Sequence, residues 1–169
     1  MKGKSRFFVK VLDIMIAVMV MFLVGAAGKA DAATGSVMIP VAEFTADGFG
    51  GSYLKSFSGG YLAGSADGPC LVAPVRIPGS ATKINKVFVY LTDTNLTDDP
   101  WFWLTAINMG TAFAEDYFYS TVTAGTDTIQ AIELTLDKHA LVKGRVYQLG
   151  TCLYDGQQLY GVKVVYTVP

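Results

Sequence analysis

Apolar and polar side chains alternate along much of this 169-residue chain, and the alternation limits its fold more than any other feature. In the segment Thr82–Thr92, for example, Val87, Val89 and Leu91 occupy every second position. Successive side chains of a β-strand point to opposite faces of the sheet, so this spacing predicts a strand with one buried face. After position 32, no long stretch has apolar residues at helical spacing without glycine or β-branched residues intervening. An all-β fold is therefore expected.

The expected strands are short and are separated by turn signals rich in Gly, Pro, Asn and Asp. Many short strands with this punctuation are typical of two antiparallel sheets packed face to face. The sequence therefore predicts an antiparallel two-sheet sandwich of the jelly-roll type. The expected strands are Val37–Thr45, Ser52–Phe57, Tyr61–Ala63, Cys70–Ile77, Thr82–Thr92, Trp101–Ile107, Phe118–Val122, Ile129–Leu136, Arg145–Tyr154 and Leu159–Val168.

The first 32 residues are ordered like a secretory signal peptide. A basic start is followed by an almost wholly apolar run from Val11 to Gly28, and an Ala-Asp-Ala sequence then ends at Ala32. We expect cleavage after Ala32, which leaves residues 33–169 as a single exported domain in the periplasm or outside the cell. Asp13, near the start of the apolar run, departs from the signal pattern because it weakens insertion. The alternative is an uncleaved membrane anchor, but the run is marginal for a span of about 20 residues and ends in Gly and Ala without a second charged stop.

Charge argues against a nucleic-acid partner. Five of the 13 Lys and Arg residues and two of the 14 Asp and Glu residues lie in the first 32 positions, so the remaining domain has a net charge of −4. Proteins that bind nucleic acid need clustered Lys and Arg residues against the phosphates. The basic residues of this domain are scattered, and no nucleic acid is expected to bind.

Cys70 and Cys152 are the only cysteines, and both follow the expected signal peptide. An even number of cysteines in an exported chain favours a disulfide. Their bond would close a loop of roughly 80 residues, worth about 4 kcal/mol in the chain-entropy model. The alternative is a pair of buried free thiols, each packing as a small apolar side chain.

Two segments resemble parts of uncharacterised secreted bacterial proteins. The first is Ala73–Ile84, in which an Ala-Pro-Val strand leads through Pro78-Gly79 into Ala-Thr and a second strand. The other, Leu159–Thr167, resembles the closing strand of the same proteins, with Gly161 indicating a bulge or a close backbone approach. The resemblance implies one exported β-sandwich. It implies no activity, cofactor or site residue.

Aromatic residues form the candidate ligand-binding group: Trp101, Trp103, Tyr117 and Tyr119. The two tryptophans are two positions apart in an expected strand, so their rings should share a face. On an exposed face, adjacent flat rings would offer a platform on which sugar rings stack, and aromatic residues are also enriched at protein interfaces. The alternative is that both rings belong to the core, where large aromatic side chains are buried on average.

The candidate metal ligands are Asp93, Asp98 and Asp99, in an acidic segment between two expected strands. Carboxylate oxygens are the ligands that Ca²⁺ prefers. The segment lacks the glycine and the terminal glutamate of an EF-hand loop. The alternative is a solvated turn, since Asp, Asn and Thr are common turn residues. No other cofactor is expected.

Catalytic residues are scarce. Glu115 and Asp116 are adjacent in sequence, so strand geometry would point them to opposite faces and prevent them from flanking one bond. His139 is the only histidine, and no nucleophile or zinc partner can be assigned to it. We therefore predict a non-catalytic exported binding module, with a glycan as a candidate ligand. The alternative is a structural or self-associating protein of the cell surface or periplasm; an enzyme ranks third.

Overall fold

The computed structural model describes residues 32–169 except 49–52, 57–58, 112, 122–124 and 138–139, and without the side chains of residues 113 and 115–121. The expected signal peptide therefore lies outside the described residues up to position 31, and its cleavage remains a prediction. Residues 32–169 form one compact unit. In the part of the chain that is described, no helix is long and apolar enough to span a membrane.

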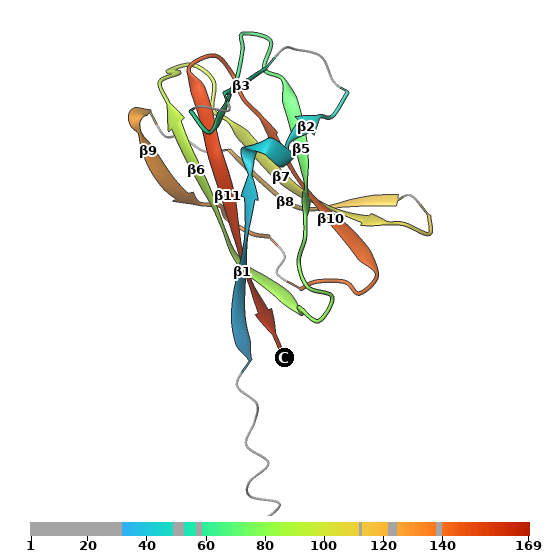
Figure 1. Ribbon diagram of the computed structural model, residues 1–169. Helices are drawn as coiled ribbons and strands as arrows, with labels where there is room; N and C mark the ends of the chain where they lie inside the picture. Colours follow the sequence, from blue (N-terminus) through green and yellow to red (C-terminus); the bar gives the residue numbers. More distant parts are fainter. Residues whose placement is uncertain (1–31, 49–52, 57–58, 112, 122–124, 138–139) are drawn as a thin grey trace, which may run out of the picture. The chain divides into compact units, whose positions relative to one another are not determined.

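Two antiparallel sheets make up this unit (Figure 1). Sheet A contains β1 (Ala33–Pro40), β3 (Leu54–Ser56), β4 (Tyr61–Ala63), β6 (Lys83–Asp93), β9 (Thr126–Glu133) and β11 (Gln157–Val168). Sheet B contains β2 (Thr45–Ala46), β5 (Cys70–Val75), β7 (Trp101–Asn108), β8 (Phe113–Thr121) and β10 (Arg145–Cys152). The predicted all-β, two-sheet antiparallel sandwich is confirmed.

The strand order within the sheets rarely follows the chain. Sheet A runs β3-β4-β11-β6-β9, and β1 also pairs with β11; sheet B runs β2-β5-β10-β7-β8. One edge of β11 is divided between two partners, because β4 pairs with Gln158 and Leu159 while β1 pairs from Gly161 onward. Figure 1 shows β11 between β6 and β1. The last strand in the sequence is thus the central strand of sheet A.

The core lies between the two sheets and is built from alternate positions of each long strand. Val87, Val89 and Leu91 of β6 are fully buried, as their spacing predicts, and Phe102 and Leu104 of β7 meet them from sheet B. Burying a side chain of this size contributes about 1.5–3 kcal/mol. The same alternation sends the intervening residues of β7 to the outer face of sheet B, where the candidate site lies.

The first expected strand, Val37–Thr45, proves to be two strands in different sheets. Strand β1 ends at Pro40, a 3₁₀ turn covers Val41–Glu43, and the chain then enters sheet B as β2. Proline has no N–H to extend a ladder of backbone hydrogen bonds, so the pairing with β11 stops there. Phe44, fully buried, anchors the crossing between the sheets.

The closing strand also departs from simple alternation. Sequence spacing places Tyr160 and Tyr166 on the same face as Val162 and Val164, but both tyrosines are only partly buried. Against β6, the register of β11 shifts between Leu159 and Gly161 and again between Val165 and Tyr166. Each extra residue reverses which face the following side chains occupy. The bulge expected at Gly161 is confirmed, and it moves Tyr160 out of the core.

The disulfide between Cys70 and Cys152 is confirmed. It joins neighbouring positions of β5 and β10, whose α-carbons lie 4.0 Å apart, and the two cysteines are separated by 82 positions in sequence. The described residues contain no free cysteine. The bond holds two adjacent strands of sheet B together beside the candidate site.

Candidate functional site

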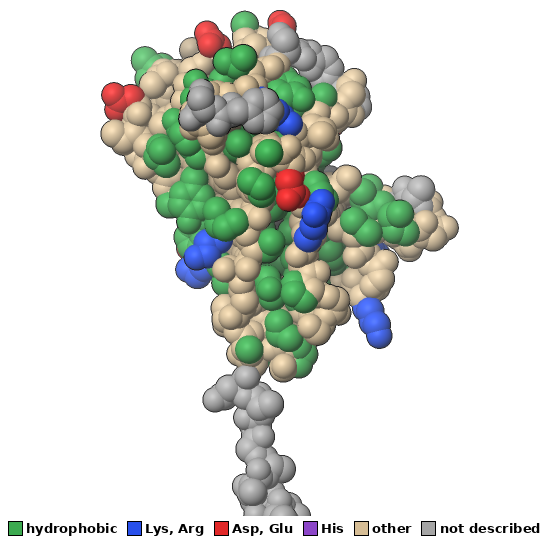
Figure 2. Space-filling view, viewed as in Figure 1, with side chains coloured by type: hydrophobic (Ala, Val, Ile, Leu, Met, Phe, Trp, Pro, Cys, Tyr) green, Lys and Arg blue, Asp and Glu red, His purple; other side chains and the backbone are tan. Residues whose placement is uncertain are grey.

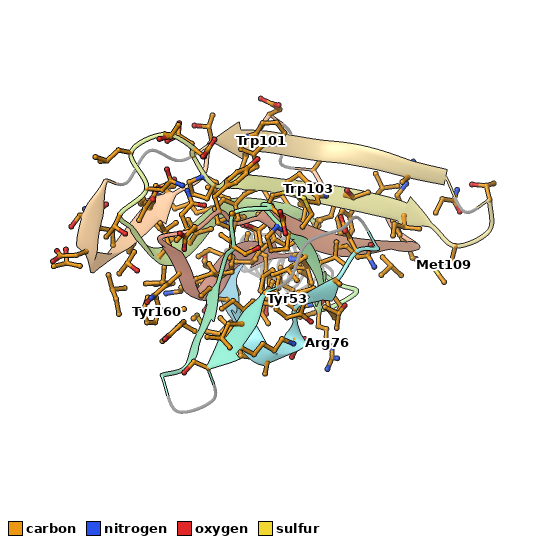
Figure 3. The ribbon with its side chains drawn as sticks, turned by 90° about the horizontal axis from the view of Figure 1, so that it is seen from above. Tyr53, Arg76, Trp101, Trp103, Met109 and Tyr160 are labelled. Atoms are coloured by element: carbon orange, nitrogen blue, oxygen red, sulfur yellow. A yellow bond between two sulfur atoms is a disulfide. The ribbon has the colours of Figure 1, made fainter. Side chains whose placement is uncertain are left out.

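Trp101 and Trp103 lie on the outer face of sheet B. Both belong to β7, in which Phe102 and Leu104 point inward and are buried. Trp101 is 40% exposed, and Trp103 is half-buried. The prediction that the two rings share a face is confirmed, and the alternative that both belong to the core is wrong. Figure 3 shows the pair beside β7, on the opposite side of the molecule from Tyr160 and Arg76.

The indole of Trp103 lies over Gly150 on the neighbouring strand β10. These two residues face each other in the register of β7 and β10. A Cβ atom added to Gly150 would come within 2.0 Å of Cε2 and 2.2 Å of Cζ2 of the indole. The ring therefore occupies the space that a side chain at position 150 would fill. Gly150 lets the indole lie down on the sheet instead of standing away from it.

Trp101 and Trp103 are bordered by a strip that becomes more polar along β7. Trp101 lies opposite Cys152 of the disulfide, and Thr105 lies opposite Gln148 beyond Trp103. Thr105 and Gln148 are both half-buried on this outer face. The strip combines two flat apolar rings with amide and hydroxyl groups a few ångströms further along the same face. We call Trp101, Trp103, Gly150, Gln148 and Thr105 the tryptophan face.

For the two tyrosines predicted to join this group, the structure describes the backbone positions only. Tyr119 of β8 lies opposite Trp103 in the register. Tyr117 falls at the irregularity between the pairs that Leu104 and Thr105 make with β8. The side chains of both tyrosines lie outside the described residues, so their part in ligand binding stays a prediction.

The acidic segment after β6 is organised by hydrogen bonds within the protein. Asp93 is buried, and its carboxylate accepts hydrogen bonds from the Asn95 backbone N–H (2.9 Å) and the Gln157 side-chain amide (3.4 Å). The same amide donates to the backbone oxygen of Asp98 at 2.6 Å. Among the described residues, no group of three or more His, Cys, Asp or Glu side chains is placed to hold a metal ion. Asp93, Asp98 and Asp99 are thus not grouped as the candidate calcium site would require, and the segment is a hydrogen-bonded turn.

Burial is the main influence on the ionisation of Asp93. Loss of hydration raises the pKa of this carboxyl above its ordinary value, and the nearby charge of Asp99 acts in the same direction. The hydrogen bonds from Asn95 and Gln157 lower the pKa but do not cancel the effect of burial. Asp93 therefore acts as a structural acceptor within the loop.

The structure places the candidate catalytic residues only in part. Glu115 and Asp116 occupy successive positions of β8, opposite Ala106 and Thr105 respectively, although the strand expected from the sequence began only at Phe118. His139 lies outside the described residues. The side chains of Glu115 and Asp116 lie outside them as well, so the absence of a catalytic pair stays a prediction.

Two surface hollows could not be predicted from the sequence, because each is lined by segments that are far apart in the chain. The larger is a groove of about 490 Å³ between the Arg76–Thr82 loop and the Leu141–Tyr147 segment. The smaller, about 240 Å³, lies where the partner of β11 changes from β1 to β4, and includes Tyr61 and Tyr160. These two rings are tilted against each other with centroids 5.8 Å apart. The bulge signal at Gly161 was the only hint in the sequence that Tyr160 would leave the core.

The sequence matches no protein-family model, and no curated protein is similar to it. Solved structures do share its architecture. The C-terminal CBM6 module of LamC, a marine laminarinase from Zobellia galactanivorans, has a TM-score of 0.50 at 12% identity, covering 77% of this chain and 98% of that one. This similarity shows a common β-sandwich fold.

Two further structures are more distant. The xylan-binding module CBM15 has a TM-score of 0.48 at 17% identity, covering 80% of this chain and 97% of its own. A carbohydrate-binding module from Cellvibrio mixtus lichenase 5A, solved with cellotriose, has a TM-score of 0.44 at 18% identity, covering 76% and 95%.

Proposed function

We propose that this chain is a non-catalytic glycan-binding module, and that the tryptophan face holds the sugar. The observation that carries the proposal is the position of the Trp103 indole, laid over Gly150 on the outer side of a rigid sheet. A half-buried ring in this position is fixed on one side and available on the other. The fold shared with a carbohydrate-binding module of LamC supports the same proposal.

The physical basis is the two-sided character of a sugar ring. Its C–H groups make one face apolar enough to cover an aromatic ring, while its hydroxyls need hydrogen-bond partners at the rim. Trp101 and Trp103 supply the rings, and Gln148 supplies an amide that can both donate and accept. Because both rings lie on regular strand β7, little conformational entropy is lost when a ligand binds.

Export belongs to the same proposal. The basic, apolar and small-residue order of the first 32 residues and the disulfide between Cys70 and Cys152 both point to an oxidising compartment. N-terminal sequencing of the protein from an expressing bacterium tests it. A start at Ala33 in the exported fraction supports export, whereas an intact leader in the cytosol contradicts it.

Affinity electrophoresis in native gels tests glycan binding. The probes are soluble xylan, laminarin and hydroxyethyl cellulose, and binding slows migration through the gel that contains the ligand. Trp103→Ala should abolish the retardation, since losing an aromatic hot spot costs about 2 kcal/mol or more, roughly 30-fold in affinity. Failure of the wild-type protein to bind any of a broad set of glycans would contradict the proposal.

Tyr160→Ala is the matched control. Tyr160 is also a partly exposed aromatic residue, but it belongs to sheet A and the smaller hollow. We expect this variant to bind as the wild type does. If Tyr160→Ala abolishes retardation while Trp103→Ala does not, the tryptophan face is the wrong site. Thermal melts of both variants distinguish loss of the ligand contact from loss of the fold.

A further inference from the structure

The loop between β6 and β7 presents one leucine to solvent on a fixed support. Leu96 is 93% exposed, the most exposed of the large apolar side chains described. The carboxamide oxygen of Asn95 beside it accepts hydrogen bonds from the backbone N–H groups of Thr97 (2.7 Å) and Asp98 (2.9 Å). The loop is also tied to the β10–β11 turn, since the Asn95 amide donates to the Asp155 oxygen at 3.0 Å.

Single exposed apolar side chains are common on protein surfaces, but this leucine lies on a loop that hydrogen bonds hold in place. The hydrogen bonds fix the loop from below, through Asp93 and Gln157, and leave Leu96 at its tip. Asp98, also exposed, stands two residues away. The tip therefore combines an apolar knob with negative charge.

The groove of about 490 Å³ lies at the opposite end of the sandwich and has the complementary character. Its lining includes Val142 and Val146, each 43% exposed, which makes part of the wall apolar and open to water. Three cationic residues also line it: Arg76, Lys143 and Arg145. Glu43 lies 3.8 Å from Arg76 in an ion pair, so its negative charge offsets part of the positive charge of the groove.

Charge is segregated between the two ends of the domain. The end where the β4–β5, β6–β7 and β10–β11 loops meet carries these described aspartates: Asp47, Asp67, Asp93, Asp98, Asp99, Asp127 and Asp155. The other end carries the three cations of the groove and Lys83, with Asp137. In Figure 2 most of the visible acidic side chains lie toward the top, one lies mid-face beside a basic side chain, and basic side chains occur from near the top to the lower end.

We propose that copies of this chain associate head to tail, with the Leu96 loop of one copy inserted in the groove of the next. The Leu96 side chain packs against Val142 and Val146 of the next copy, and Asp98 faces its Lys143. This association goes beyond the proposed function and does not depend on it. A knob and a groove on different surfaces make a heterologous contact, which leaves a free knob and a free groove at the ends of every oligomer. Such a contact extends into open chains.

Sedimentation of two complementary variants tests the proposal. Leu96→Asp removes the knob and keeps the groove, whereas the double variant Val142→Asp/Lys143→Glu blocks the groove and keeps the knob. The substituted side chains are exposed, so the fold should tolerate both changes. The wild type should exceed the monomer mass increasingly as its concentration rises, and less at high salt. Each variant alone should remain a monomer.

A mixture of the two variants gives the decisive result. One intact knob and one intact groove can make a single contact, so the mixture should reach twice the monomer mass and no more. The proposal is overturned if the mixture stays monomeric, or if the wild type is a monomer at every concentration tested. Leu54→Asp is the matched control, since this side chain is also apolar and exposed but lies outside the knob and the groove. Equal loss of association in this control would also overturn it.

Discussion

Replacing Gly150 by alanine should disable the tryptophan face without touching either tryptophan. The added Cβ would lie 2.0 Å from Cε2 of Trp103, whereas carbon atoms that are not bonded settle at about 3.5 Å. The indole must therefore lift by about 1.5 Å or swing away from β10. Because the ring lies on the surface, it can move into solvent, and the strands need not separate.

The effect on stability should be small because two contributions oppose each other. Gly150 lies in a regular strand outside the left-handed region, so alanine there gains about 0.5–1 kcal/mol in conformational entropy. Overpacking costs about 1–3 kcal/mol when neighbours cannot move, and less when one of them is a surface ring. We expect a net destabilisation of about 1 kcal/mol or less, with a loss of roughly 30-fold in glycan affinity.

A double-mutant cycle with Trp103→Ala isolates this contact. Once the indole is absent, Gly150→Ala has nothing to displace and should become stabilising by about 0.5–1 kcal/mol. Urea unfolding measures the four stabilities, and the fluorescence of Trp103 in a Trp101→Phe background reports the exposure of the ring. Unchanged fluorescence and affinity in Gly150→Ala would refute the reasoning, as would the same stability change in both backgrounds.

Three further predictions concern the framework around the site. Replacing Cys70 and Cys152 by alanine should lower the free energy of unfolding by about 4–5 kcal/mol in urea titrations, because 82 positions separate the cysteines; a loss under 1 kcal/mol would contradict the chain-entropy reasoning. Gln157→Ala should cost about 2–4 kcal/mol in the same assay, since the buried amide serves Asp93 and two backbone groups, and an unchanged midpoint would count against it. Burial raises the pKa of Asp93, so on acidification the folded state takes up the proton before the unfolded chain does. Protonation of this carboxyl therefore stabilises the folded state as the pH falls toward the ordinary pKa of an aspartic acid. The stability of Asp93→Asn relative to wild type should therefore decrease on acidification from neutral pH, and a difference that is constant with pH would exclude this effect.

Sequence alternation predicted the sheets well wherever one residue on each strand simply opposed one residue on the next. Val87, Val89 and Leu91 are buried as their spacing indicates, and the Trp101–Ile107 segment is a strand with both tryptophans on one face. The pairing of Cys70 with Cys152 followed from compartment and number alone. These inferences need only local periodicity or a count of residues.

The errors arose where local periodicity is interrupted. Pro40 ends one strand and lets the chain cross to the other sheet within what looked like a single apolar segment. The bulges in β11 turn Tyr160 and Tyr166 away from the interior. Whether the tryptophan face pointed inward or outward depended on which sheet covered the other side of β7, and no local pattern contains that information. The groove beside Lys143 likewise requires two loops about 60 residues apart.

Strand β11 has a consequence for how this molecule must be made. Its twelve residues follow every other strand of this domain in sequence, yet they supply pairing partners for β1, β4 and β6. Sheet A therefore has no central strand until β11 has been synthesised, and the pairing of β1 with β11 joins opposite ends of the domain, a contact that forms slowly. Deleting Gln157–Val168 would remove the central strand of sheet A, and that sheet cannot be completed before these residues have been made.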